Sequence, residues 1–590
     1  MSDPRSFYKT QIEKYSTHLS TASKKLAFSS LLRLLVFLVM AYLVYHFFGN
    51  SSVITATLVI GIAIFLFLVS RHSDLRYERD KYRELIKINE NELEVLDRKF
   101  LHLPDGSEFE DPLHPFSQDI DLFGRASFFQ YLNRTALVEG KQVLAQMLLS
   151  NNIDKIERKQ EAAKELGEKA DWRQNFSALA TLVKTETRTG TILNWLKNYK
   201  TFVPKVMKWL PFAFSILSGI VIAAYYFNLI GGIELGLWFF TGLGITGIYL
   251  KKISLLSSSV SKVQDTFHQY YQLLSLIENT EFSSELLKEK KQLIYSEKQK
   301  ASATLRKFSK AIDALDQRNN MIFGIFGNGF LLWDLRQSYK LETWIRENSE
   351  SVEKWFNAIE FLDAYNTLGN FAFNHPKYVF PDINHDSHIA EATQLAHPLL
   401  DPEKRIANDF SIEKEQFFII TGANMAGKST FLRTVSLQIL MANVGLPVCG
   451  ASCRYSPIKL ITSMRTTDSL TDDESYFFSE LKRLKYIVEE IKTDKYFIIL
   501  DEILKGTNST DKAIGSRKFI EKLVRSRSTG IIATHDLSLC EVTEVLPQVK
   551  NYYFDAEIIN DELNFDYRFK KGICQNMNAS FLLKKMEIVD

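Results

Sequence analysis

The chain has 590 residues, which is too long for a single hydrophobic core, so we expect several domains. Its formal net charge of +2 excludes a strongly basic protein, and any contact with nucleic acid must therefore be local. The four cysteines form no disulfide framework, which excludes a disulfide-stapled secreted class and suits a reducing cytosol.

Two pairs of long apolar segments predict membrane-spanning helical hairpins. The first pair covers about 30–48 and 53–70, and the second covers 209–227 and 233–250. Each pair is joined by a short loop, and the apolar runs approach the length that a bilayer requires. A buried helical hairpin in a soluble core is the alternative interpretation, but the same form occurs twice.

Basic residues flank both hairpins and are absent from both loops. Lys24 and Lys25 precede the first hairpin, Arg71 follows it, and Lys251 and Lys252 follow the second. The positive-inside bias then places both loops outside the cell and the rest of the chain in the cytoplasm. The sequence therefore predicts an integral, multi-pass protein with four spans and membrane lipid as a partner. Its N-terminus, middle region and C-terminal domain would all be cytoplasmic.

The segments around the second hairpin have helical periodicity and few glycines. A basic stretch runs from Lys288 to Lys310 and carries eight Lys or Arg against two Glu. It is either a solvated helix face or a surface that contacts phosphates. The expected organisation is an N-terminal segment with the first hairpin (1–101), a helical region (102–208), the second hairpin (209–250), a second helical region (251–385) and a C-terminal domain (386–590).

A phosphate-binding loop is predicted at 421–430, TGANMAGKST, between an apolar strand and a helix. Gly422 and Gly427 let the backbone N–H groups turn towards phosphate oxygens at the start of the helix. Lys428 should reach the β- and γ-phosphates, and the Ser429 hydroxyl should bind Mg²⁺. This pattern predicts a site for ATP and Mg²⁺.

Two later strands carry the remaining candidate catalytic groups. A buried apolar run ends in Asp501 and Glu502, and a third strand, GIIATH, ends in His535. Asp501 is suited to holding Mg²⁺, Glu502 to activating water, and His535 to sensing the γ-phosphate. Ligand groups gather at the carboxyl ends of parallel strands. The expected fold is an α/β P-loop NTPase domain with a mostly parallel sheet, preceded by an all-α core and lever region carrying the two hairpins.

With these motifs the chain resembles the MutS family of ATPases. TGANMAGKST is similar to that family's TGPNMGGKST, DEILKGTNSTD (501–511) to DEIGRGTSTYD, and ATHD (533–536) to ATHY. The resemblance is dense over roughly 390–590 and sparser over 117–190, where the start of the family's helical core would lie. It does not include the hairpins. Leu504 stands where the family has a glycine.

The resemblance implies a role for further residues. Ile406 would lie on the adenine side, and Ser475 would reach the γ-phosphate of a partner subunit, which implies a homodimer through the ATPase domain. Three acidic residues, 472–474, precede Ser475 where the family has a glycine-containing turn and a basic residue. The candidate nucleotide-binding residues of the loop are Gly422, Ala423, Asn424, Met425, Ala426, Gly427, Lys428, Ser429 and Thr430.

The expected function is that of a membrane-anchored MutS-like ATPase with a dimeric, clamp-like cycle acting on DNA, through backbone contacts, or on another partner. The family's mismatch-reading Phe-x-Glu motif has no counterpart in the first 110 residues, so base-pair inspection is not expected. One alternative is a nucleotide-switched membrane scaffold that does not bind DNA. Another is an exporter ATPase, which is disfavoured because 431–495 lacks an LSGGQ-like signature.

Overall fold

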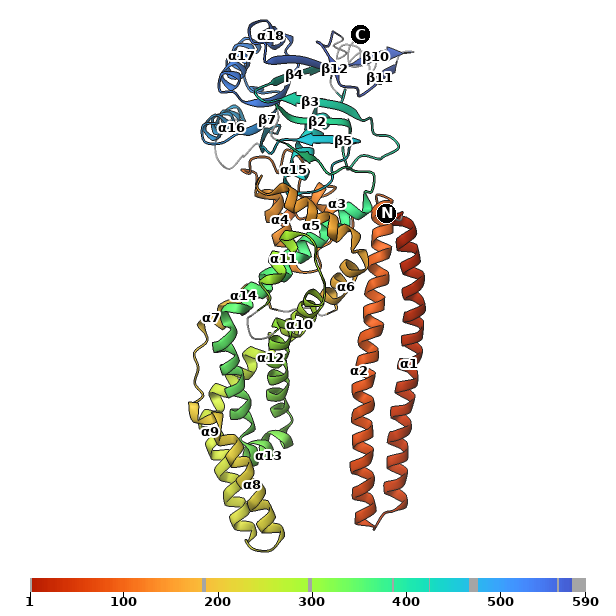
Figure 1. Ribbon diagram of the computed structural model, residues 1–590, viewed down its shortest axis with the longest axis vertical. Helices are drawn as coiled ribbons and strands as arrows, with labels where there is room; N and C mark the ends of the chain where they lie inside the picture. Colours follow the sequence, from red (N-terminus) through yellow and green to blue (C-terminus); the bar gives the residue numbers. More distant parts are fainter. Residues whose placement is uncertain are drawn as a thin grey trace.

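The computed structural model describes residues 3–182, 187–295, 300–384, 387–423, 425–465, 476–559 and 562–575. The β-sheets lie at one end of an elongated molecule, and two helical hairpins extend towards the other end (Figure 1). A helical middle region joins the two ends.

The first hairpin consists of α1 (Pro4–His46) and α2 (Ser51–Leu96), which pack along each other. The predicted apolar runs form only the part of each helix near the loop. The remainder is polar and continues each helix towards the sheets (Figure 1). The most apolar window of each helix is 6% buried. Such exposure of apolar side chains to water is unfavourable, and a lipid environment would relieve it.

The second hairpin consists of α8 (Leu210–Tyr226) and α9 (Gly232–Ser261), so both predicted segments are helical. By length and composition, α1, α2 and α9 are apolar enough to cross a membrane, whereas α8 is a shorter apolar helix. A further short apolar helix, α13 (Met321–Leu331), packs against α8 and α9. Sequence analysis predicted helix there but did not distinguish this apolar segment.

The middle region is all helical, as predicted. Its longest helix is α14 (Trp333–Asn374), whose 42 residues correspond to about 63 Å. The other helices are α3 (Phe128–Leu132), α4 (Val138–Leu149), α5 (Ile156–Glu168), α6 (Ala170–Thr181), α7 (Thr189–Asn198), α10 (Gln264–Glu278), α11 (Glu285–Gln292) and α12 (Ala301–Asp316), with 3₁₀ turns η1 (Ser107–Phe109), η2 (Lys205–Lys208) and η3 (Gln317–Asn319).

The C-terminal part is α/β. Its largest sheet has the order β12-β9-β4-β8-β7-β6, and all its neighbouring strands are parallel except β12 and β9. The strands of this sheet are β4 (Phe417–Gly422), β6 (Lys459–Ser463), β7 (Tyr496–Asp501), β8 (Thr529–Ala533), β9 (Val549–Phe554) and β12 (Lys570–Lys571). The helices of this part are α15 (Lys428–Val444), α16 (Tyr476–Glu490), α17 (Ser509–Arg525), α18 (Val542–Val545) and the turn η4 (Leu537–Glu541).

Two smaller sheets complete this part. One has the order β1-β5-β2-β3, and the other pairs β10 with β11. Their strands are β1 (Asp382–Ile383), β2 (His388–Leu395), β3 (Asn408–Glu413), β5 (Ser452–Tyr455), β10 (Ala556–Ile559) and β11 (Glu562–Phe565). The predicted mostly parallel sheet is therefore present, with a mixed sheet beside it.

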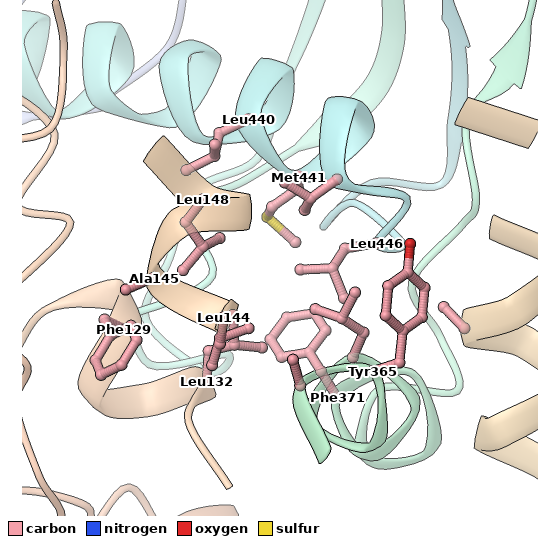
Figure 2. Packing of buried hydrophobic residues seen from close by; sticks show 14 of the residues in the cluster. Phe129, Leu132, Leu144, Ala145, Leu148, Tyr365, Phe371, Leu440, Met441 and Leu446 are labelled. Carbon is pink, nitrogen blue, oxygen red and sulfur yellow. The ribbon is translucent and has the colours of Figure 1, made fainter. Parts of the chain in front are cut away.

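A continuous apolar core joins the α/β part to the helical region. Leu440 and Met441 of α15 face Leu148 of α4, and Tyr365 and Phe371 of α14 lie in the same cluster (Figure 2). Close-packed apolar side chains transmit displacements, because a side chain that moves must also move its neighbours. The helix that follows the predicted phosphate loop therefore shares one apolar core with the long helix α14 and contacts α4 and α5 directly.

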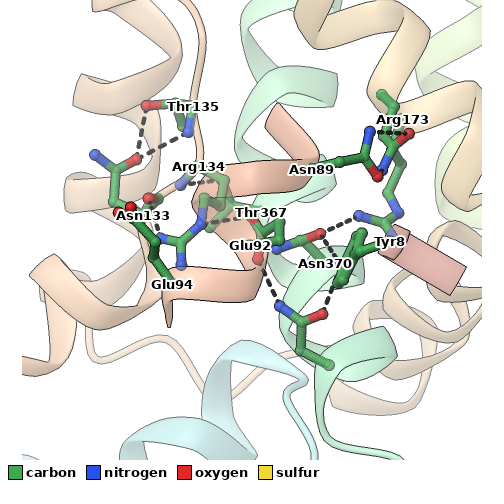
Figure 3. Close-up of polar contacts among 12 residues, drawn as sticks. Tyr8, Asn89, Glu92, Glu94, Asn133, Arg134, Thr135, Arg173, Thr367 and Asn370 are labelled. Carbon is green, nitrogen blue, oxygen red and sulfur yellow. Dashed lines mark hydrogen bonds and ion pairs between the residues drawn. The ribbon is translucent and has the colours of Figure 1, made fainter. Parts of the chain in front are cut away.

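A buried polar network fixes the first hairpin to the same end of α14 (Figure 3). Glu92 of α2 accepts hydrogen bonds from Arg134 at 2.6 Å and from Asn374 of α14 at 2.7 Å. Asn374 in turn accepts one from the Tyr8 hydroxyl of α1 at 2.6 Å. The Glu92–Arg134 ion pair is largely buried, so removing either partner would cost about 3–5 kcal/mol.

Candidate nucleotide-binding site

The three strands that carry the predicted site residues are neighbours in the large sheet. In the register of β4, β8 and β7, Ala533 lies opposite both Ile420 and Asp501. The phosphate loop, the Asp501 pair and the segment holding His535 therefore leave the sheet at one edge. Strand β8 ends at Ala533, so His535 lies two residues beyond the strand that sequence analysis extended to it.

The loop after β4 has the backbone that its glycines were expected to provide. Gly427 has φ of 101°, in the left-handed region, and α15 begins at the next residue, Lys428. A Cβ at Gly422 would lie 2.5 Å from the carbonyl oxygen of Phe554 on the neighbouring strand. Ala426 is buried and Met425 is exposed. Asn424 lies outside the described residues.

The Lys428 ammonium group is folded back onto the loop. Its Nζ donates hydrogen bonds to the carbonyl oxygens of Gly422 at 2.8 Å and Ala423 at 2.9 Å. Burial lowers the pKa of Lys428, and the nearby carboxylates of Asp501 and Glu502 oppose that shift. When ATP binds, the Lys428 ammonium would donate to phosphate oxygens instead of these two carbonyls, because charged phosphate oxygens are the stronger acceptors.

The two predicted Mg²⁺ ligands are already in contact. The Ser429 hydroxyl donates to the Asp501 carboxylate at 2.7 Å. A hydroxyl and a carboxylate are hard oxygen donors, the kind that Mg²⁺ prefers, and Mg²⁺ commonly completes its shell with substrate phosphates and water. Among the described residues no group of three or more His, Cys, Asp or Glu could hold a metal ion by itself. The pair thus fits an ion shared with a nucleotide.

Glu502 is held by a lysine that sequence analysis did not identify. Lys512 Nζ donates to the Glu502 carboxylate at 2.7 Å. Burial alone would raise the pKa of Glu502, but the hydrogen bond and charge of Lys512 outweigh it and lower that pKa. Half-buried His535 faces the same charges, and burial together with Lys428 lowers its pKa. Glu502 is therefore ionised and His535 neutral near pH 7, as a base and a neutral donor require.

One cavity of about 600 Å³ is lined by Lys428, Ser429, Asp501, Glu502 and His535. It is large enough for a nucleotide, because small-molecule sites typically measure about 300–1,000 Å³. Ile406 also lines this cavity, and its place on the adenine side stays a prediction. The cavity is also lined by His397, Asn408, Met425, Gly427, Thr430 and Tyr567.

Tyr567 supplies an aromatic wall that sequence analysis missed. Its ring lies so close to the phosphate loop that a Cβ at Gly427 would be 3.0 Å from it. Asn408 holds this segment by donating to the Tyr567 carbonyl at 3.0 Å and accepting from Phe569 N at 2.8 Å. The segment is 159 residues from Asn408 in sequence, so no local pattern could have revealed the pairing.

We expect Tyr567→Ala to weaken ATP binding by roughly 5- to 100-fold, because base–aromatic stacking contributes about 1–3 kcal/mol. Tyr567→Phe keeps the ring and should bind ATP as the unmodified chain does. Titration of the full chain with a fluorescent ATP analogue measures both. Equal affinity for all three proteins would show that the ring does not contact the base.

The segment after Glu502 has a strained backbone. Leu504 stands where the similar MutS motif has a glycine, and its φ is 59°. A non-glycine residue in this left-handed region costs about 1–2 kcal/mol. Glu480 of α16 stabilises the turn by accepting hydrogen bonds from the N–H groups of Leu504 at 2.5 Å and Lys505 at 3.0 Å. Burial of the Leu504 side chain offsets part of the cost.

The structure therefore brings together the loop, Lys428, Ser429, Asp501, Glu502 and His535. Ser475 lies outside the described residues, so its contact with a partner subunit stays a prediction. Lys512 and Tyr567 are additions from the tertiary structure. Lys512 stands ten residues after Glu502, on the following helix, so the sequence did contain a signal for this partner of Glu502.

Comparison with known proteins agrees with this geometry. Residues 418–586 match the family described as MutS domain V. The chain is 30% identical over 262 residues to MutS protein homolog 4 of Homo sapiens, covering 42% of this chain and 27% of that protein. It is 31% identical over 244 residues to DNA mismatch repair protein MutS of Flavobacterium psychrophilum, covering 40% and 28%.

A plant relative matches in the same way. The chain is 30% identical over 200 residues to DNA mismatch repair protein MSH4 of Arabidopsis thaliana, covering 32% of this chain and 24% of that protein. The chain therefore spans about a quarter of the length of these relatives.

The parallel sheet, the glycine loop after β4 and the cavity beside it are the features of a P-loop α/β domain. The match to MutS domain V and the relatives at about 30% identity support placing this C-terminal region in the MutS family.

Proposed function

We propose that the chain is a membrane-anchored, MutS-like ATPase that couples ATP binding and hydrolysis to movement of its helical region. The observation that carries the proposal is the contact of Ser429 with Asp501 at 2.7 Å, beside Lys428 and Glu502 in one cavity. This constellation supports a site in which a phosphate-binding lysine, Mg²⁺ ligands and a general base surround one reacting phosphate.

The residues would divide the chemistry as follows. Lys428 and the loop N–H groups neutralise the β- and γ-phosphates as negative charge shifts during transfer. Ser429 and Asp501 would hold Mg²⁺, which when bound draws charge from the phosphate oxygens. Glu502 leaves Lys512 and accepts a proton from the attacking water. His535 orients the γ-phosphate as a neutral donor.

Contacts between α15 and the helical region supply a route for coupling. Arg433, on the helix that begins at Lys428, pairs with Asp121 at 2.9 Å and donates to the Asp119 carbonyl at 3.1 Å. The Asp119 carboxylate accepts from Arg465 N at 2.8 Å. Arg465 directly precedes the segment that contains Ser475. A shift of α15 on nucleotide binding would therefore reach the helical region through Asp121 and Asp119, and through Asp119 it would reach Arg465.

Membrane anchoring is supported by the arrangement of the hairpins. The loops of both hairpins lie at the end of the molecule opposite the sheets (Figure 1). Their apolar helices can therefore enter one bilayer from the same side, with the ATPase domain away from the lipid. We propose four spans with the N-terminus, the middle region and the ATPase domain in the cytoplasm.

DNA is the partner suggested by the names of the relatives, which are called mismatch repair proteins. Part of the predicted basic stretch is already occupied, because Lys290 covers the Phe361 ring and Lys291 donates to the Thr280 carbonyl at 2.6 Å. Arg306 and Lys310 are exposed on α12. We propose DNA backbone contact through this face, with a scaffold that does not bind DNA as the alternative.

One preparation tests both parts of the proposal. We expect the full chain in lipid nanodiscs to hydrolyse ATP, and to lose that activity when EDTA removes Mg²⁺. Binding of duplex DNA should weaken steeply as the salt concentration rises. For each phosphate contacted, the affinity should fall about tenfold when the salt concentration rises tenfold. ATPase activity without DNA binding at low salt would favour the scaffold. Absence of hydrolysis would contradict the ATPase itself.

A further inference from the structure

The short helix α13 exposes an apolar face at the far end of α14. No charged residue lies between Arg318 and Asp334. On α13, Met321 is 77% exposed, Ile322 71% and Phe326 57%. Exposed side chains of this size on adjacent turns form an unfavourable surface in water.

The position of α13 is set by close contact with α9. A Cβ at Gly242 would lie 2.2 Å from the carbonyl oxygen of Gly329, so the two helix backbones meet with no side chain between them. The Phe239 ring, three residues before Gly242 on α9, also packs against Gly329. Gly242 lies in the middle of the apolar run of α9, a helix long and apolar enough to cross a membrane. Helix α13 is therefore level with that run.

Several polar groups at the ends of α13 are paired, which a lipid environment favours. Unpaired backbone groups in hydrocarbon each cost several kcal/mol. The Asn320 side chain accepts from the N–H groups of Ile322 at 3.1 Å and Phe323 at 3.2 Å, and the Leu332 N–H donates to the Gly327 carbonyl. The Arg318 guanidinium and the Asp334 carboxylate, at the two ends of the uncharged segment, pair at 3.1 Å.

We propose that α13 inserts into the bilayer beside α8 and α9 without crossing it, with its exposed face against lipid acyl chains. Its 11 residues span about 16 Å, roughly half of the hydrocarbon thickness. The chain enters through α12 and returns through α14, so both neighbours stay on the cytoplasmic side. This inference rests on the proposed anchoring by the second hairpin.

Insertion of α13 changes what α14 connects. One end of α14 lies in the apolar core that it shares with α15 (Figure 2). At the same end, Asn374 donates a hydrogen bond to Glu92 of the first hairpin. The other end of α14 follows α13 directly, at Trp333, whose indole N–H donates to the Ala314 carbonyl at 2.7 Å. The helix thus links the nucleotide domain to the interior of the bilayer, and the nucleotide cycle would move α13 within the lipid.

Spin-label accessibility in the full chain tests the proposal. The native cysteines Cys449, Cys453, Cys540 and Cys574 are all buried. Ile322→Cys and Phe326→Cys carry the label on α13, with Leu237→Cys on α9 as the lipid control and Lys354→Cys on α14 as the aqueous control. In phosphatidylcholine–phosphatidylglycerol liposomes, we expect labels at 322, 326 and 237 to collide with oxygen more than with a water-soluble nickel chelate. The label at 354 should do the reverse.

The outcomes separate this inference from the proposed function. A nickel-accessible label at 322 and 326 beside a lipid-exposed label at 237 would overturn the insertion of α13 while leaving the anchor intact. A nickel-accessible label at 237 as well would overturn the anchor and this inference together. Labels at 322 and 326 shielded from both reagents would show that protein, such as a second copy, covers the face, and would also overturn it. Unchanged nucleotide binding verifies that each variant is folded.

Discussion

Replacing Lys428 with alanine is expected to reduce ATP affinity by on the order of 100-fold or more. The Lys428 ammonium is buried and donates hydrogen bonds to two loop carbonyls, those of Gly422 and Ala423. On ATP binding these contacts would be exchanged for phosphate oxygens. Hydrogen bonds to charged groups contribute about 1.5–3 kcal/mol each, so losing two gives this magnitude. Isothermal titration of the full chain in nanodiscs with ATP and Mg²⁺ measures the effect.

Lys518→Ala is the matched control, because this lysine is exposed on α17 outside the cavity. It should bind ATP as the unmodified chain does. Removing Lys428 also frees the carbonyls of Gly422 and Ala423, so thermal unfolding without nucleotide should accompany the titration. Unchanged affinity in a folded Lys428→Ala protein would refute the assignment of the loop.

The second large effect is expected at Glu502. Glu502→Gln should lower the rate of ATP hydrolysis by about 10²- to 10⁴-fold, the usual contribution of a general base, while ATP affinity is kept. Glutamine retains the size of the side chain and its contact with Lys512, but it cannot accept the proton from water. Single-turnover hydrolysis measures the chemical step directly, and bound ATP should persist.

Glu544→Gln provides a control for the loss of one carboxylate, since Glu544 is exposed on α18 and lies outside the cavity. Its turnover should equal that of the unmodified chain. Wild-type turnover in Glu502→Gln would assign the base to another group. A trapped ATP complex of this variant, isolated from membranes, would also retain the physiological partner for identification.

Much of the nucleotide site was readable from the sequence because its parts are contiguous. The loop from Gly422 to Ser429 must follow a strand and open a helix, and the glycines meet a backbone requirement that no distant residue can replace. The same holds for Asp501 and Glu502 at the end of a buried strand. The apolar hairpins were visible for a similar reason, because crossing a bilayer demands a long uninterrupted run.

Other features depend on contacts between distant residues, and only the tertiary structure decided them. Tyr567 reaches the phosphate loop through Asn408, and Leu504 adopts a left-handed backbone because Glu480 on another helix caps its turn. Strand β8 ends before His535. The short apolar helix α13 was recognised as a separate element only from its close contact with α9.

The sequence by itself therefore determined the class of site, the helical middle region and the apolar hairpins. These rest on local spacing and on the length of uncharged runs. The tertiary structure decided which lysine restrains Glu502, which ring borders the nucleotide cavity and where α14 ends. Such facts arise from packing between segments far apart in the chain, and apolar packing of that kind leaves only a general pattern in the sequence.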